Sequence, residues 1–168
     1  MTRCMRNTTF AYMKLAMDSD CLIKLAKAGL KECVCVAWQI CIPALVRRET
    51  VERAPALQDA MQIRDNIASG RLTVVGGGAP AKQGEDEVLR LYRAGGFDAV
   101  ATDDARFIRR LRGLGVPYAV PGAIVVQLRQ AGALSLAEAE RALAALRPHI
   151  SAEEHAVAQL VLRGGVVS

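Results

Sequence analysis

The sequence lacks any apolar run long enough to cross a bilayer, because glycine, proline or charged residues interrupt its longest apolar stretches. It also lacks the features of a signal peptide: the segment Met1–Phe10 carries Arg3 and Arg6 but no apolar stretch leading to a small-residue cleavage site. Histidine is scarce, with only His149 and His155 near the C-terminus, and we assign a catalytic role to neither. These absences predict a cytoplasmic protein without a membrane-spanning segment.

The five cysteines lack the spacing of a zinc site, because no second Cys or His pair stands at a suitable distance. Three of them lie in or beside an apolar run from Cys33 to Ile42, in which Cys and Val alternate at first. That alternation is typical of an extended strand with small buried side chains. We therefore expect buried, non-ligating cysteines, which stand at positions 4, 21, 33, 35 and 41.

The length of 168 residues, 52% of them hydrophobic, fits one domain that buries most of its apolar surface on folding. We expect a single domain over residues 1–168, with a core at about 13–122 and C-terminal helices at about 123–165. The net charge of +5 and the pI of about 9.2 permit a polyanionic partner. Several arginines could line a groove for phosphates or could form the solvated faces of helices: Arg47, Arg48, Arg106, Arg109, Arg110 and Arg112.

Short apolar stretches alternate with amphipathic ones along the chain, which is typical of βαβ units. The sequence therefore predicts a three-layer α/β/α fold with a central parallel sheet. The expected extended segments are 13–17, 33–42, 72–75, 99–101 and 116–120, and the expected helices are 21–28, 43–51, 58–68, 85–94 and 106–114. Two further helices begin at capping boxes, in which Ser135 and Ser151 precede Glu138 and Glu154 by three residues.

Two expected strands end directly at acidic residues. Asp18 and Asp20 follow the first strand, and Asp103 and Asp104 follow the segment 99–101. In parallel sheets, ligands bind beyond the carboxyl ends of the strands. Each acid alone would be explained as the cap of the next helix. Two pairs at two strand-to-helix junctions favour a site at this edge of the sheet.

Helical segments supply further acids. Glu49 follows Leu45 by four residues, and Glu85 precedes an apolar stripe at helical spacing, so we expect Glu85 to face inward. Asp86 and Glu87 lie in the same turn and point elsewhere. Clustered carboxylates repel unless a proton or a cation neutralises them, and Mg²⁺ or Mn²⁺ prefers oxygen ligands of this kind. The pattern predicts a site for divalent cations that could assist phosphodiester hydrolysis.

The order of these segments resembles the PIN-domain family. The segment from Met17 to Ile23 looks like the family's opening strand, Asp and apolar helix, and Ile42-Pro43 followed by Glu49 looks like its next motif. Gly84-Glu85-Asp86-Glu87 resembles a Gly-Glu-x-Glu variant, and Asp103-Asp104 with the Arg-rich segment after it resembles the Asp-Asp-x-x-Arg motif. The likeness extends from about Lys14 to Gly165.

The resemblance implies a ribonuclease that depends on Mg²⁺ or Mn²⁺. Many relatives are toxins of toxin–antitoxin pairs, which act as homodimers and are silenced by a small partner protein. Carried over by motif, Asp18 and Asp104 would be the principal metal ligands, and Glu49 would complete the site. Glu85 or Glu87 would be a further ligand, and Asp103 would be a ligand or would hold its neighbour. In the commoner branch of the family, Asp86 would align with the third acid.

Other functions stay open on the sequence alone. Asp18-Ser19-Asp20 after a strand resembles the nucleophile and acid of haloacid-dehalogenase-type phosphatases, but the intermediate Thr/Ser and Lys motifs are missing and Glu49 would have no role. A receiver-like signalling domain would need an Asp after the third strand, where Gly76 stands. A third alternative is a non-catalytic domain that binds RNA or protein.

Overall fold

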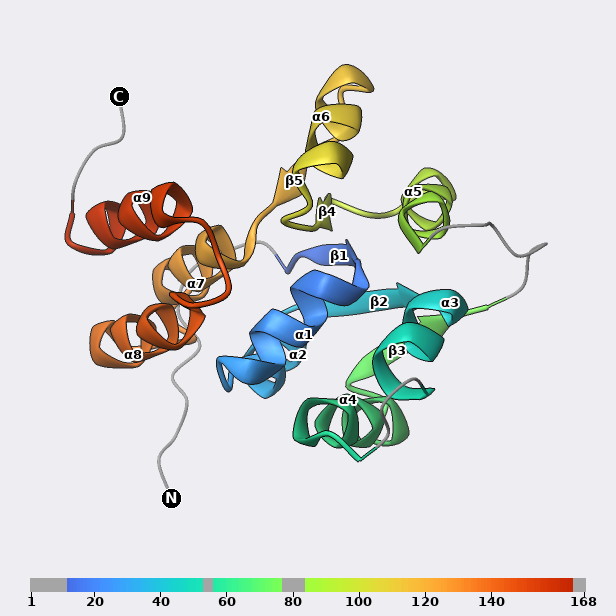
Figure 1. Cartoon of the computed structure of the whole chain (residues 1–168), viewed down its shortest axis with the longest axis horizontal. Helices are drawn as coiled ribbons and strands as arrows, with labels where there is room; N and C mark the ends of the chain where they lie inside the picture. Colours follow the sequence, from blue (N-terminus) through green and yellow to red (C-terminus); the bar gives the residue numbers. More distant parts are fainter. Residues whose placement is uncertain (1–11, 53–55, 77–83, 165–168) are drawn as a thin grey trace.

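A five-stranded, all-parallel sheet forms the centre of the molecule in the computed structural model, which describes residues 12–52, 56–76 and 84–164 (Figure 1). The strands are β1 (Lys14–Met17), β2 (Gln39–Pro43), β3 (Leu72–Val75), β4 (Ala99–Ala101) and β5 (Tyr118–Ala119). Their order in the sheet is β3-β2-β1-β4-β5. The helices are α1 (Ser19–Lys27), α2 (Lys31–Ala37), α3 (Ala44–Arg47), the π-helical turn η1 (Arg48–Glu52), α4 (Gln58–Ala68), α5 (Gly84–Arg93), α6 (Ala105–Gly113), α7 (Pro121–Gln130), α8 (Leu136–Leu146) and α9 (Ala152–Leu162). The predicted α/β fold with a central parallel sheet is confirmed.

The strand order places β1 beside β4, although about 80 residues separate them in the sequence. Met17 pairs with Ala101, and the backbone N–H of Asp18 donates to the carbonyl of Ala101 at 3.1 Å. The next residue on β4 is Thr102, whose N–H donates to Ala119 on β5. The carboxyl ends of the three strands therefore meet at one edge of the sheet, and the residues that follow them become neighbours.

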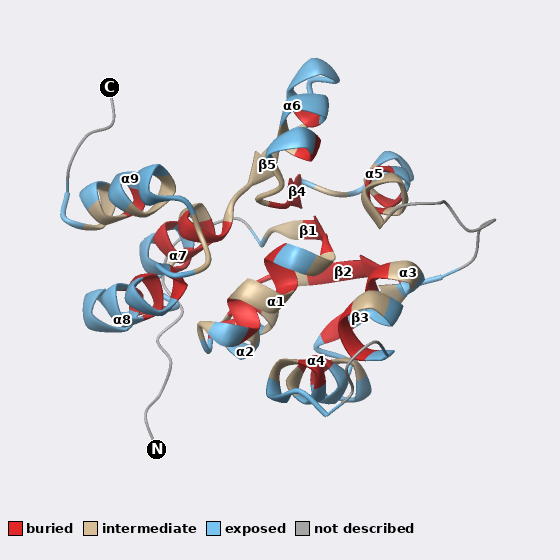
Figure 2. Cartoon of the chain, viewed as in Figure 1, coloured by how far each residue is buried: buried red, intermediate tan, exposed pale blue. Residues whose placement is uncertain are grey.

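The core lies between the sheet and the helices that cover its two faces, as the buried residues in Figure 2 show. Leu15, Ala16 and Met17 are fully buried on β1, as expected for a central strand of a parallel sheet covered on both sides. Helix α5 packs against β1, β2 and β4, whereas α1 packs against α2 and α4. Phe107 and Leu111 on α6 add large, fully buried side chains.

The prediction of an extended segment over 33–42 is wrong for its first half. Lys31–Ala37 form helix α2, and only Gln39–Pro43 form a strand. Leu30, Val34 and Trp38 are buried and spaced by four residues, so this apolar face packs inward at helical periodicity. Cys21 and Cys41 are buried as expected, while Cys33 and Cys35, on α2, are only half-buried; Cys4 lies outside the described residues.

Helices α7, α8 and α9 pack together at one side of the molecule (Figure 1), and α7 and α8 also contact α1. The capping box of Ser135 and Glu138 is confirmed, because each side chain bonds the backbone of the other residue. At the start of α9, Ser151 accepts a hydrogen bond from the N–H of Glu154, but the Glu154 carboxylate turns to another element. No helix in the described part of the chain is long and apolar enough to span a membrane.

Candidate metal centre

Asp18 lies at the carboxyl end of β1 and is only 6% exposed. It is the N-cap residue of α1: its Oδ1 accepts a hydrogen bond from the N–H of Cys21 at 2.8 Å. Its Oδ2 accepts a hydrogen bond from the hydroxyl of Thr102. Burial raises the pKa of Asp18 to about 7, although both hydrogen bonds lower it, and the charge of Asp103 raises it further. The two hydrogen bonds therefore do not fully offset the cost of burying an ionised Asp18 carboxylate at neutral pH.

Thr102 connects Asp18 with the segment that carries Asp104. Its hydroxyl donates to Asp18, and the same oxygen accepts a hydrogen bond from the N–H of Asp104 at 3.2 Å. Thr102 is fully buried, so this connection is shielded from water. Thr102 could not be predicted as a site residue from the sequence, because one threonine beside two aspartates has no distinctive spacing.

Asp104 is the N-cap residue of α6. Its Oδ1 accepts hydrogen bonds from the N–H groups of Arg106 and Phe107, both at 2.8 Å. Within the described residues its Oδ2 has no hydrogen-bond partner, so one carboxylate oxygen remains available to a ligand. The capping role expected for such an acid is thus present, and it occupies only one of the two oxygens.

Asp103 and Asp20 share the ammonium group of Lys24. Lys24 lies 2.8 Å from Oδ2 of Asp20 and also donates to Oδ2 of Asp103. Burial raises the pKa of Asp103, and Lys24 only partly offsets this increase. Partial burial also raises the pKa of Asp20, but the hydrogen bond and charge of Lys24 lower it below its ordinary value overall. The Asp103 side chain is 7% exposed, and its buried Oδ1 has no hydrogen-bond partner in the described structure.

Glu154 reaches this region from α9, far away in the sequence. Its Oε1 accepts a hydrogen bond from the N–H of Gly122 at 2.7 Å, at the start of α7. Burial raises the pKa of Glu154, and the charge of Asp103 adds to the increase. In the sequence, the spacing of Ser151 and Glu154 predicts a capping box and gives no sign that Glu154 lies near Asp103.

The acids on α5 and η1 lie at a second position on the same edge. Burial raises the pKa of Glu85, and the charge of Asp104 raises it further, so these two carboxylates lie within electrostatic range. Glu49 is in the π-helical turn η1, a rare geometry that occurs frequently at functional sites. Its carboxylate lies against Gly84: a Cβ atom built there would stand 2.9 Å from Oε2 of Glu49.

The two other acids of α5 are engaged in ion pairs. Glu87 lies 3.1 Å from Arg90 in the same helix, and Asp86 lies 2.6 Å from Arg110 on α6. Glu85, Asp86 and Glu87 are all half-buried, so the expected inward orientation of Glu85 stays a prediction. The pairing of Asp86 and Glu87 with arginines makes them the weaker candidates for a metal ligand.

The structure therefore connects the predicted site residues in pairs. Asp18 is connected to the backbone of Asp104 through Thr102, the charge of Asp104 raises the pKa of Glu85, and Glu49 lies beside the first residue of α5. Among residues 12–52, 56–76 and 84–164, no three His, Cys, Asp or Glu side chains form a group that could hold a metal ion. The candidate ligands are carboxylates, and oxygen ligands of this kind suit a hard divalent cation. One carboxylate oxygen of Asp103 is buried and has no hydrogen-bond partner in the described structure.

Comparisons of the chain with protein-family models, curated proteins and solved structures found no match. The resemblance to the PIN-domain family thus remains a prediction from the motifs.

A cavity of about 820 Å³ adjoins the acidic edge. Lys24, Asp103 and Glu154 are among the polar side chains that line it, and Ile108 and Val157 are among the apolar ones. Asp18 and Asp104 do not line it. The cavity and the acidic edge are separate features that meet at Asp103.

Proposed function

We propose that the protein is a nuclease that hydrolyses RNA with the help of Mg²⁺ or Mn²⁺ bound at the acidic edge of the sheet. The observation that carries the proposal is the buried carboxylate of Asp18, which is tied through the Thr102 hydroxyl to the backbone of Asp104. The Asp18 carboxylate is thereby held near the backbone of Asp104, whose own Oδ1 is held by the N–H groups of Arg106 and Phe107. Such rigid placement is what a catalytic cation requires of its ligands.

The excess of acidic side chains at this edge of the sheet supports the binding of a cation there. Asp18, Glu85, Asp103 and Glu154 all have raised pKa values, for which burial is the largest cause. Lys24 forms ion pairs with Asp103 and Asp20, and its charge also lowers the pKa of Glu154, which burial nevertheless raises overall. A divalent cation would favour the ionised form of the remaining acids. Carboxylates that share a cation repel each other without it, so a spread arrangement of Asp18, Asp104, Glu85 and Glu49 is compatible with the proposal.

The chain's own residues would have distinct roles in the reaction. Asp18 and Asp104 would hold the cation, with Glu49 and Glu85 as further ligands or as groups that orient water. The cation, when bound, would supply Lewis-acid stabilisation of the phosphodiester charge. Arg106 on α6 is exposed and lies within electrostatic range of Glu85, so it could contact a phosphate next to the acids.

The choice of RNA as substrate rests on the resemblance and on the net charge of +5. The same resemblance is the basis for proposing a homodimer and a small antitoxin partner. Oligomeric state in solution and copurification with the product of a neighbouring gene would test these two proposals.

The phosphatase alternative gains no support from the geometry. Asp20, which would be the acid of that mechanism, is 59% exposed and paired with Lys24.

The experiment is an RNA cleavage assay with Mn²⁺ and with EDTA, for the wild type, Asp18→Asn and Asp65→Asn. Asp65 is an exposed residue of α4 and provides the matched control. We expect cleavage that EDTA and Asp18→Asn abolish and that Asp65→Asn leaves unchanged. Equal cleavage in all samples would reject the assignment, and RNA binding without cleavage would favour the non-catalytic alternative.

A further inference from the structure

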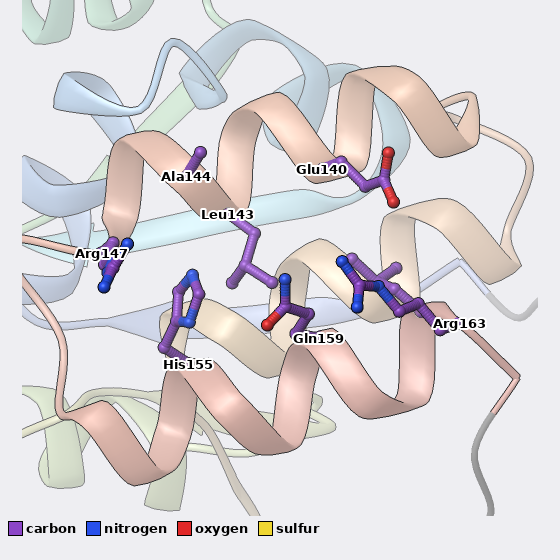
Figure 3. Close-up of a pocket in the computed structure, with 8 residues that line it drawn as sticks. Glu140, Leu143, Ala144, Arg147, His155, Gln159 and Arg163 are labelled. Carbon is purple, nitrogen blue, oxygen red and sulfur yellow. The ribbon is translucent and has the colours of Figure 1, made fainter.

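A second cavity, of about 330 Å³, lies between α8 and α9 (Figure 3). Its polar lining consists of Glu140, Arg147, His155, Gln159 and Arg163. The two helices are joined by a short turn, so Arg147 and His155 stand at the end near that turn, and Glu140 and Arg163 stand at the other end. None of these residues belongs to the acidic edge of the sheet.

The cavity is rich in hydrogen-bond donors. Arg147 and Arg163 are exposed, and neither forms an ion pair with any part of the chain that the structure describes. His155 and Gln159 are half-buried, one turn apart on the face of α9 toward α8. Glu140 is the only acid among the lining residues. Leu143 is buried and forms an apolar surface between the two ends (Figure 3).

Helix capping explains part of this arrangement. Arg147 and Arg163 are the C-cap residues of α8 and α9, where a cation interacts favourably with the helix dipole. Capping does not explain why His155 and Gln159 line the same cavity as Arg147. Arg147 and His155 line the end that is farther from Glu140, and Gln159 lies between this end and the opposite one, one turn farther along α9 (Figure 3).

We propose that this end of the cavity binds a phosphate group, held by Arg147, His155 and Gln159. The guanidinium of arginine can donate two parallel hydrogen bonds to phosphate oxygens, and such charge-assisted bonds are the stronger ones in proteins. Glu140 disfavours an anion at the opposite end. The volume lies at the lower limit of typical ligand pockets, which suits one nucleotide or a small phosphate ester with an apolar part on Leu143.

The phosphate could belong to an RNA strand or to a free phosphorylated small molecule, and one experiment can separate the two sources. In the first arm, thermal unfolding is followed with increasing sodium phosphate, against sodium chloride at equal ionic strength. In the second arm, fluorescence anisotropy measures binding of a labelled single-stranded RNA in EDTA. Binding without divalent cations does not depend on the proposed nuclease activity, so the two proposals can fail separately.

The variants are Arg147→Gln, Glu140→Gln and the control Arg141→Gln. Arg141 is an exposed residue of α8 that lines a different cavity, so its loss changes the net charge equally. We expect Arg147→Gln to weaken binding about tenfold, Glu140→Gln to strengthen it and Arg141→Gln to leave it nearly unchanged.

An effect specific to Arg147 in the RNA arm identifies the strand as the source, and an effect in the phosphate arm alone identifies a free phosphate ester. Either result supports the site. Equal losses in Arg147→Gln and Arg141→Gln, or no binding by the wild type in either arm, would overturn the proposal. If Arg147→Gln lowers only stability, Arg147 is a helix cap and the proposal is also wrong.

Discussion

The hydroxyl of Thr102 donates a hydrogen bond to the carboxylate of Asp18 across 84 residues of sequence. This bond exists because β1 and β4 are neighbours in the sheet and end at the same level. Thr102 is the single residue between the end of β4 and Asp103, so the bond joins the buried Asp18 to the start of the segment that carries Asp103 and Asp104. The geometry of the candidate metal centre therefore depends on Thr102 as much as on the acids themselves.

Thr102→Val should weaken both the fold and the site. Valine has nearly the same shape but leaves the buried Asp18 oxygen without a donor, which lowers the free energy of unfolding by about 1–3 kcal/mol. The loss should be larger at pH 8 than at pH 5, because the ionised carboxylate depends more on the donor. Urea denaturation at both pH values measures it. Thr73→Val, at an exposed position on β3, is the control, and equal losses in the two variants would refute the role of Thr102.

The stability of the metal-free protein should fall as the pH rises from about 4 to 7. Burial raises the pKa of Asp18 from its ordinary 3.8 to about 7, so in this range the folded state keeps a proton that the unfolded chain has lost. The free energy of unfolding then decreases with pH and levels off above pH 7. Asp103, Glu85 and Glu154 have raised pKa values and act in the same direction.

Asp18→Asn removes the largest part of this dependence. Urea denaturation in EDTA between pH 5 and 8 should show a flatter pH profile for Asp18→Asn than for the wild type. Parallel profiles would mean that Asp18 does not titrate in this range.

Gly84→Ala should impair the metal site while leaving the fold intact. The added Cβ would stand 2.9 Å from Oε2 of Glu49, and the flexible Glu49 side chain can move away at little cost in stability. We expect Mn²⁺ to stabilise this variant less than the wild type in thermal unfolding, by an amount similar to that in Glu49→Gln. An unchanged Mn²⁺ response in both variants would exclude Glu49 from the site.

Gly122→Ala should loosen the attachment of α9. A Cβ at Gly122 would lie 3.1 Å from Oε1 of Glu154 and 3.3 Å from the Cβ of Ala158, which the helix backbone holds in place. We expect a loss of about 1–3 kcal/mol in the free energy of unfolding. Gly113→Ala at the end of α6 meets nothing within 4 Å and should instead gain up to about 1 kcal/mol. Gains in both variants would show that the contact with Glu154 and Ala158 is unimportant.

Much of the fold could be predicted because local pattern and final structure agree. The bounds of α4 and β3 match the predicted segments 58–68 and 72–75, and Gly70 ends α4 in the left-handed conformation. The prediction for residues 33–37 is wrong because the alternation of Cys and Val is typical of a strand. The helical signal in this region is the four-residue spacing of Leu30, Val34 and Trp38, which are all buried.

The candidate site was predictable only where acids follow strands directly. Asp18 and Asp104 met that condition, because strand order brings their ends together. Lys24 and Glu154 could not be found in this way. Their interactions with Asp103 depend on how α1 and α9 are placed in three dimensions, whereas the local spacing of Ser151 and Glu154 predicts only a capping box.

The most direct test is a crystal structure with Mn²⁺, in which anomalous scattering locates the ion independently of any assay. We predict one principal anomalous peak at the carboxyl edge of the sheet, within coordination distance of Asp18 and Asp104. The absence of a peak at this edge at saturating Mn²⁺, or a peak bound only by residues elsewhere in the chain, would contradict the proposed metal centre.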